Sequence, residues 1–387
     1  MRPVGLERVA IALLVAAEVA GGFALGRLGP AFDVGLWGAV RPWLVVLAAL
    51  TLLLAFVRSG LPRHRVLLVA VGISLLHVLL LFSLFWSARV IPDPEEVLNV
   101  SILVVAMPFA ALAFAEDTEA RQDWILKLLF VLGLLSLPVA LAGFSSVSSE
   151  LSLRTVGSIR IARTAGLAAV AALALGLRSR SWLWLIPVPV WVLVMLASGN
   201  RASLLALVVG GVPLLFSTRR VQALSGGAIM ALVAALVVVT VPVAGEIVRF
   251  FFQEAIWESD GRIYLADRGV LFGSALALFL RAPWTGHGLG GYGALAGTYY
   301  EYPHNLTLSF ATELGVLGLV PYALLLGMSL LAFRRSNSPT HLGMAGVFLY
   351  LFVAAQFSGS YGDAFLLWIA GLAVMAAPRR GGDGSPA

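Results

Sequence analysis

Long apolar runs separated by short polar segments make up most of this chain. A run of about 15 to 25 apolar residues is long enough to cross a bilayer as a helix. Twelve such runs occur: Val9–Leu25, Leu36–Val57, Val66–Trp86, Leu98–Ala115, Trp124–Phe144, Ala162–Leu177, Trp182–Ala197, Ala202–Phe216, Ala223–Val243, Asn305–Phe333, Leu342–Phe357 and Ala364–Ala377. The pattern predicts an all-α fold, a polytopic membrane helical bundle of about 12 transmembrane helices in a single integral-membrane domain over residues 1–387.

One connection is long enough to hold structure of its own, the segment Ala244–Pro303 between the ninth and tenth apolar runs. Glu246–Trp257 and Arg262–Leu280 both show apolar residues at helical spacing, with a Ser-Asp-Gly break between them. We therefore expect a long loop that carries two helices lying over one face of the membrane.

Composition and charge agree with this architecture. The 387 residues are 60% hydrophobic and only 12% charged, which is far from the balance of a soluble domain. The 26 basic residues give a net charge of +6 and fall in short clusters in alternate loops. Positively charged loops resist translocation, so both termini are expected in the cytoplasm and residues 244–303 on the outer side. Scattered clusters give no reason to expect nucleic-acid binding, and the absence of cysteine excludes a disulfide framework and a cysteine nucleophile.

Basic residues should be sparse in the outer loops, so the arginines found there need a reason. Arg201 closes a four-residue turn between two apolar runs of about 15 residues, each about 23 Å long against a hydrocarbon core of about 30 Å. The turn should lie in a recess, where a guanidinium beside a helix N-terminus can hold an anion such as pyrophosphate. For Arg201, the alternative is a plain interfacial anchor. Arg262 opens the second predicted outer helix, and the alternative to a role in the site is a structural ion pair with Asp260 or Asp267. The outer set also includes Arg154, Arg160, Arg163, Arg268 and Arg281.

His304 stands at the mouth of the tenth apolar run, and Glu313 follows nine residues later, about 13 Å along the same helix. Ionisable groups are costly within a membrane, so this pair indicates a functional site. A shielded neutral imidazole can act as a general base near neutral pH. The alternative is that His304 only caps the helix. No metal-ligand spacing accompanies it, so neither a metal site nor a cofactor is expected.

The residues around these positions resemble the bacterial O-antigen ligase and O-antigen polymerase superfamily of integral-membrane glycosyltransferases. The matching pieces lie in the C-terminal half: Ser198-Gly199-Asn200-Arg201, Gly261-Arg262, the run Pro283–Gly288, and Pro303-His304-Asn305 followed by Leu308, Glu313, Gly315 and Gly318. The N-terminal helices match only in hydropathy.

The resemblance implies a metal-independent, inverting transfer at the periplasmic face of the bacterial inner membrane. The donor would be a glycan on undecaprenyl pyrophosphate, and the acceptor a sugar hydroxyl such as one of lipid A-core. It assigns the donor diphosphate to Arg201 and Arg262 and the catalytic base to His304, with Asn305, Glu313, Arg268, Arg163 and Arg160 in support.

Three functions stay open at this stage. Twelve helices with one long outer segment resemble the ligases more than the polymerases, although Arg262 and Gly273 have an eleven-residue spacing found in polymerases. A transporter of lipid-linked glycans would also use outer cations. It would need a polar path across the bilayer, and the cytoplasmic halves of the predicted helices carry few charges.

Overall fold

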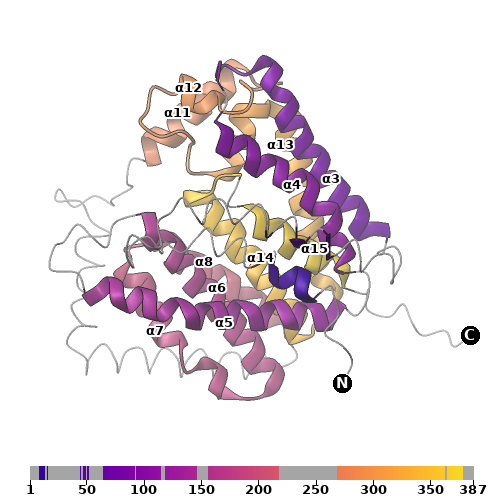
Figure 1. Cartoon of the computed structure of the whole chain (residues 1–387), viewed down its shortest axis with the longest axis vertical. Helices are drawn as coiled ribbons and strands as arrows, with labels where there is room; N and C mark the ends of the chain where they lie inside the picture. The colour runs from indigo at the N-terminus through magenta and orange to yellow at the C-terminus, as the bar shows by residue number, and fades with distance from the viewer. Residues whose placement is uncertain are drawn as a thin grey trace, which may run out of the picture.

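The computed structural model describes residues 8–13, 15, 44, 47–48, 50–51, 64–91, 93–114, 118–145, 156–217, 268–361 and 364–377. Within these ranges the regular structure is helical, with no strand (Figure 1). The helices are α3 (His64–Phe82), α4 (Pro94–Leu112), α5 (Thr118–Ser145), α6 (Val156–Ser179), α7 (Val188–Ala197), α8 (Arg201–Gly211), α11 (Arg268–Arg281), α12 (Gly291–Leu295), α13 (Leu306–Ala332), α14 (Pro339–Ser358) and α15 (Phe365–Ala376). Four short 3₁₀ segments extend or precede them: η3 (Ser83–Trp86), η4 (Trp182–Leu185), η5 (Val212–Phe216) and η7 (Phe333–Arg335). The all-α expectation is confirmed for this part of the chain.

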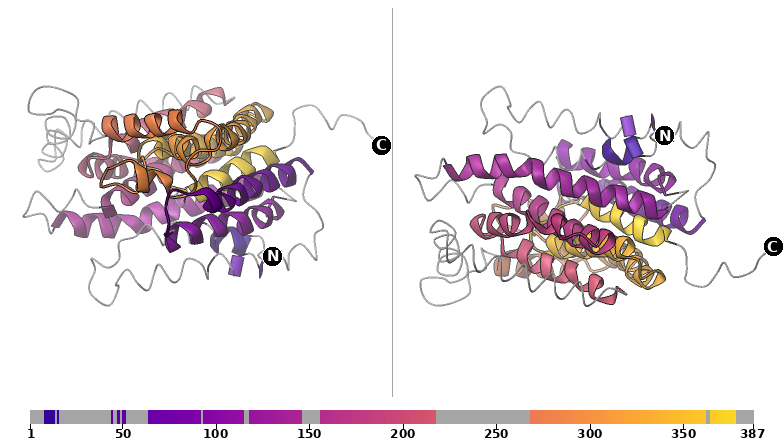
Figure 2. Two further views of the ribbon diagram at one scale, coloured as in Figure 1. Left: turned by 90° about the horizontal axis from the view of Figure 1, so that it is seen from above. Right: turned by 90° about the horizontal axis from the view of Figure 1, so that it is seen from below.

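Two groups of helices pack on either side of α14. Helices α3, α4, α13 and α15 form one group, and α5, α6, α7 and α8 form the other. Helix α15 is apolar on all sides and every residue from Phe365 to Ala376 is buried, as expected for the central helix of a bundle. Most of the helices follow one common direction (Figure 2).

The outer faces of two long helices carry exposed apolar stripes. On α13, Leu317, Leu324 and Leu331 repeat every seven residues with 51%, 63% and 71% exposure. On α3, Leu68, Leu75 and Phe82 repeat in the same way. Continuous apolar surface of this kind is unfavourable in water and natural in lipid. Four described helices are long and apolar enough to cross a membrane: Arg65–Trp86, Ile159–Ser179, Leu306–Arg335 and Pro339–Ser358.

Each predicted apolar run that falls on described residues corresponds to a helix or to a helix with its 3₁₀ extension. Several of these are shorter apolar helices rather than full-length spans: Glu96–Leu112, Trp182–Ala197, Arg201–Phe216 and Phe365–Ala376. The runs Ala223–Val243 and, for the most part, Val9–Leu25 and Leu36–Val57 lie outside the described residues, so the count of twelve spans stays a prediction. The predicted outer helix Glu246–Trp257 also lies outside them. The second outer helix is present as α11, and the short α12, which the pattern did not indicate, follows it.

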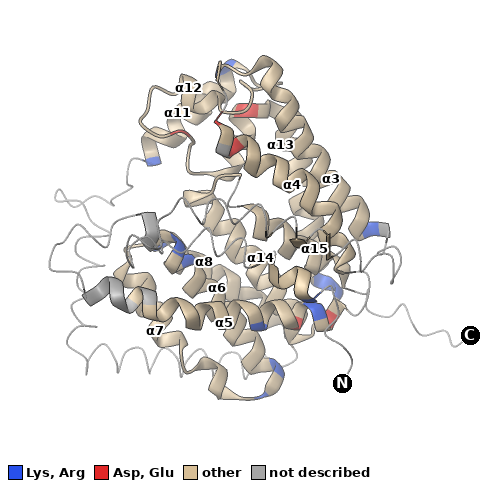
Figure 3. Ribbon diagram, viewed as in Figure 1, with Lys and Arg blue, Asp and Glu red and all other residues tan. Residues whose placement is uncertain are grey.

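Hydrogen bonds between segments that are distant in the sequence show which helix ends lie together, at either end of the bundle. At the first, the His304 end, the backbone N–H of Ala88 donates to the carbonyl of His287 at 2.9 Å. At the second, the Arg335 end, Thr118 bonds to the last turn of α15, which Arg335 also reaches. Figure 3 shows charged residues gathered toward the ends of the helices and few in between. Loops predicted to share one side of the membrane therefore meet at one end, and which end faces the periplasm stays a prediction.

Candidate functional site

The organising feature of the His304 end is a break in α13. Gly315 has φ 60° and ψ −150°, a conformation that only glycine adopts readily, so the helix is interrupted nine residues into its length. A Cβ at this position would lie 2.5 Å from the backbone carbon of Trp284, within the glycine-rich loop that precedes α13. The loop backbone therefore packs so closely against the break that only a glycine fits at position 315.

The loop also replaces the hydrogen bonds that the break removes. In an unbroken helix the N–H groups of Val316 and Leu317 would bond to the carbonyls of Thr312 and Glu313. Here those N–H groups donate to the carbonyls of Pro283 and Trp284, at 2.8 and 3.2 Å. The freed carbonyls of Thr312 and Glu313 accept from the N–H groups of His287 and Gly288, both at 2.9 Å.

This reciprocal pairing, which we call the loop–helix interlock, gives partners to the N–H groups of Val316 and Leu317 and to the carbonyls of Thr312 and Glu313. Irregular backbone inside a membrane is tolerated only where protein or water satisfies it. Backbone bonds thus join residues 283–288 of the glycine-rich loop to residues 312–317 of α13 as one structural unit.

Glu313 lies two residues before Gly315, and its buried side chain binds to the loop. Its carboxylate is 1% exposed and accepts from the N–H of Gly290 at 3.1 Å and from the hydroxyl of Tyr361 at 2.9 Å. Burial, and next the negative charge of Glu313, raise the pKa of Tyr361 well above its ordinary value, so its hydroxyl stays protonated and donates. Glu313 therefore ties the glycine-rich loop to the connection between α14 and α15, where sequence reasoning gave no partner for it.

His304 has an unusual backbone for a non-glycine residue, with φ 54°. Its imidazole contacts two aromatic rings, that of Tyr302 at 4.4 Å and that of Tyr300 at 5.1 Å between ring centroids. The next residue, Asn305, is the N-cap of α13, and its side-chain oxygen accepts from the N–H of Leu308 at 2.9 Å. The capping role considered for His304 thus belongs to Asn305, and a left-handed backbone at a non-glycine residue is typical of a functional position.

The C-terminal turn of α14 is the meeting point for three of the predicted site residues. The side-chain amide of Asn305 donates to the carbonyl of Gln356 at 3.0 Å. Nε of Arg268, the first residue of α11, donates to the carbonyl of Phe357 at 2.8 Å. Nη2 of Arg163 on α6 donates to the hydroxyl of Ser358 at 2.7 Å.

Three consecutive residues of α14 therefore receive bonds from three different elements. Donors and positive charge at the carbonyl end of a helix are favourable for stability. Arg163 and Arg268 thus have a structural role at the end of α14, beside Asn305 and one residue from His304. The sequence contained no signal for their partners, because the Phe357 carbonyl that Arg268 reaches is a backbone group and the Ser358 hydroxyl that Arg163 reaches lies 195 residues further along the chain.

The remaining predicted site residues are Arg201 on α8, Arg160 on α6, and Arg262. Arg201 is the first residue of α8, which packs against α14, and its side chain is half-buried. The side chain of Asn200 caps α8 by accepting from the N–H of Ser203 at 3.2 Å. Arg160 is exposed on α6, one turn before Arg163, and Arg262 lies outside the described residues.

Other polar residues of this end have structural partners. His287 sits in the glycine-rich loop, and its Nε2 bonds to the carbonyl of Leu278 in α11 at 2.9 Å. Because a carbonyl only accepts, Nε2 carries the proton and the ring holds the loop against α11. Arg89, in the segment after η3, pairs with Glu301 at 2.7 Å.

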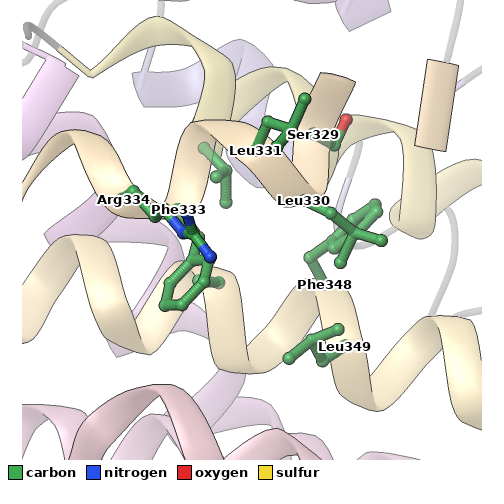
Figure 4. A pocket seen from close by; sticks show the side chains of 9 residues that line it. Ser329, Leu330, Leu331, Phe333, Arg334, Phe348 and Leu349 are labelled. Carbon is green, nitrogen blue, oxygen red and sulfur yellow. The ribbon is translucent and has the colours of Figure 1, made fainter. Parts of the chain in front are cut away.

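A pocket lies at the opposite, Arg335 end of the bundle, between α13, α14 and α15 (Figure 4). Apolar side chains line most of it, including Leu330, Phe333 and Phe348, with Arg334 also among the lining residues. It holds no pair of groups suited to acid–base chemistry, so the His304 end remains the candidate site. Among the described residues, no group of three histidine or carboxylate side chains is placed to share a metal ion.

Comparison with known proteins agrees with the position of this site. Residues 188–323, from the start of α7 to the middle of α13, match the family model described as O-antigen ligase. The matched stretch includes Arg201, the interlock, His304 and Asn305, whereas Arg160 and Arg163 precede it. A search of curated proteins returned no match to the chain. The family match confirms the resemblance of this chain to the O-antigen ligase and polymerase superfamily, whose members are glycosyltransferase-like enzymes.

Proposed function

We propose that the protein is an O-antigen ligase-like inverting glycosyltransferase. It moves a glycan from undecaprenyl pyrophosphate to a sugar hydroxyl of an acceptor such as lipid A-core. In this proposal the protein lies in the bacterial inner membrane with the His304 end facing the periplasm and both termini in the cytoplasm. The observation that carries the proposal is the backbone of His304, which is left-handed and whose ring contacts two aromatic rings at the mouth of a broken membrane helix.

His304 acts as the general base in this mechanism. The acceptor hydroxyl gives its proton to the imidazole while its oxygen attacks the anomeric carbon from the face opposite the diphosphate. The bond between that carbon and the diphosphate oxygen breaks, its electron pair leaves with undecaprenyl pyrophosphate, and the configuration inverts. A base that removes a proton in the transition state contributes about 10² to 10⁴ in rate.

Arg201 and Arg262 bind the donor diphosphate and stabilise the negative charge that it gains as the sugar bond breaks. Guanidinium groups suit this role because they are always charged and bind phosphate oxygens in a bidentate fork. Metal independence is part of the proposal, since the arginines supply the charge that a metal ion supplies in other enzymes. Arg160 adds positive charge on α6 at this end.

Asn305, Arg163 and Arg268 support the site by holding it against the end of α14, through the three bonds described above. Glu313 supports it through the interlock, because it binds the backbone of the glycine-rich loop at Gly290.

A polymerase of the same superfamily is the second candidate. It would use the same donor and join it to another lipid-linked glycan, and the spacing between Arg262 and Gly273 favours it. A transporter of lipid-linked glycans is the candidate from another class.

The decisive experiment supplies the purified protein in nanodiscs with an undecaprenyl-pyrophosphate-linked repeat unit and fluorescent lipid A-core. A new glycosidic bond, absent with the His304→Asn variant, supports an enzyme. Movement of donor between leaflets without any product supports the transporter. Glycans from a deletion strain then separate the two enzymes: unmodified core with intact polymer indicates a ligase, and core capped by single repeats indicates a polymerase.

A further inference from the structure

Three tyrosines, Tyr299, Tyr300 and Tyr302, are among the five residues that precede the proposed base His304 in the loop before α13. The ring of Tyr302 lies 4.4 Å from that of His304, and the ring of Tyr300 lies 5.1 Å from it. The ring of Tyr299 continues the row, 5.9 Å from that of Tyr300. Its side chain is 96% exposed, so a large aromatic surface is open next to His304.

This part of the loop is held in place. Between the tyrosines, Glu301 pairs with Arg89, which belongs to the segment after η3, at 2.7 Å. The hydroxyl of Thr298 also donates to the carbonyl of Tyr300 at 3.2 Å. A fixed aromatic row costs less conformational entropy on binding than a loose loop, so it is suited to receive a ligand.

The chemistry of the row fits a sugar ring. The C–H groups on one face of a pyranose are weakly positive and pack against the negative face of an aromatic ring. Tyrosine adds a hydroxyl that can donate to or accept from the sugar hydroxyls.

We infer that Tyr299, Tyr300 and Tyr302 form the subsite that binds the acceptor sugar, with Tyr299 stacking on the ring and the two inner tyrosines bringing its hydroxyl to His304. This inference rests on the proposed function, because it names the acceptor side of that site. The competing explanation is that Tyr299 belongs to the aromatic belt that tyrosine and tryptophan form at membrane interfaces.

Tyr299 can be tested without disturbing the fold because its side chain is exposed. With protein in nanodiscs, a saturating undecaprenyl-pyrophosphate-linked donor and a core oligosaccharide freed from lipid A, we expect Tyr299→Ala to raise the acceptor KM about 3- to 10-fold. The value of kcat and the donor KM should stay unchanged, since the stacking is the same in ground and transition states. Tyr299→Trp should restore the acceptor KM, whereas Tyr299→Leu, which is apolar but has no aromatic face, should not.

Phe85 provides a matched control. It is 84% exposed, aromatic, and lies at the same end of the bundle in η3. Phe85→Ala should leave the acceptor KM unchanged. An equal rise for Phe85→Ala, a wild-type KM for Tyr299→Leu, or an unchanged KM for Tyr299→Ala would each overturn the subsite.

A binding measurement separates this inference from the proposed function. Saturation-transfer NMR of the core oligosaccharide with His304→Asn protein needs no turnover, and the affinity that it reports should fall about 3- to 10-fold when Tyr299→Ala is added. If wild-type protein forms no glycosidic bond, the proposed function fails, while this measurement still decides whether the tyrosines bind the sugar. Absence of any Tyr299-dependent signal overturns the subsite even where transfer is observed.

Discussion

Replacement of His304 by asparagine separates its chemistry from its backbone conformation. The φ of 54° places His304 in the left-handed region, which costs an ordinary L-residue roughly 1–2 kcal/mol. Asparagine and glycine enter this region more readily than alanine or glutamine. His304→Asn and His304→Gly therefore keep the backbone and remove the imidazole, whereas His304→Ala and His304→Gln also impose strain.

The two effects differ enough in size to be told apart. Loss of a general base lowers the rate by about 10² to 10⁴, which is about 2.7 to 5.5 kcal/mol in the activation barrier. Backbone strain instead lowers the free energy of unfolding, by roughly 1–2 kcal/mol at most. We expect His304→Asn to keep the wild-type melting temperature and donor affinity while kcat for transfer falls at least 100-fold.

The assay measures donor affinity, thermal stability and single-turnover transfer for all four variants in nanodiscs. His304→Ala and His304→Gln should be as inactive as His304→Asn and somewhat less stable. Transfer by His304→Asn within tenfold of wild type would refute the base assignment and leave His304 with a conformational role. Lost donor binding in the asparagine variant would instead move His304 into the diphosphate site.

Three further predictions concern the cation, the interlock and the orientation. Arg201→Lys keeps the charge but loses the bidentate fork, so transfer should fall at least about tenfold, and near wild-type transfer would make Arg201 a surface anchor. Gly315→Ala combines a glycine-only backbone with a contact of 2.5 Å, so it should cost about 3 kcal/mol or more in thermal or denaturant unfolding, whereas Gly327→Ala, with nothing within 4 Å, should be neutral or stabilising. Because the chain has no cysteine, Ala294→Cys and Ser179→Cys each introduce a unique thiol at an exposed position, and only the first should react with an impermeant reagent added to spheroplasts. The reverse labelling pattern would invert the proposed orientation.

Much of the described fold could be predicted from the sequence, because the length and hydropathy of an apolar run are enough to identify a membrane helix. The run Asn305–Phe333 became α13 with Asn305 as its cap, and Leu342–Phe357 became α14. The break at Gly315 was not predicted. Its cause is a set of backbone bonds to Pro283 and Trp284, and backbone partners from another segment leave no periodic mark in the apolar pattern.

Part of the candidate site could also be predicted from the sequence. Residue type and position sufficed to single out His304 and Glu313, since ionisable groups are rare in such helices. The partners of Arg163 and Arg268 were beyond reach, because both donate to the end of α14, far away in the sequence. The tyrosines next to His304 left a signal in the sequence Tyr-Tyr-Glu-Tyr-Pro-His, where three aromatic side chains stand immediately before the predicted base.

The loop–helix interlock has a consequence for how the protein is made. A transmembrane helix that enters lipid with open backbone groups faces a cost of several kcal/mol for each of them. The groups that close the gap in α13 belong to residues 283–288, which leave the ribosome shortly before α13 itself. We therefore expect the insertion machinery to release this stretch into the bilayer as one folded hairpin. A nascent chain truncated between Gly288 and Gly318 should remain bound to the translocon until the helix is complete.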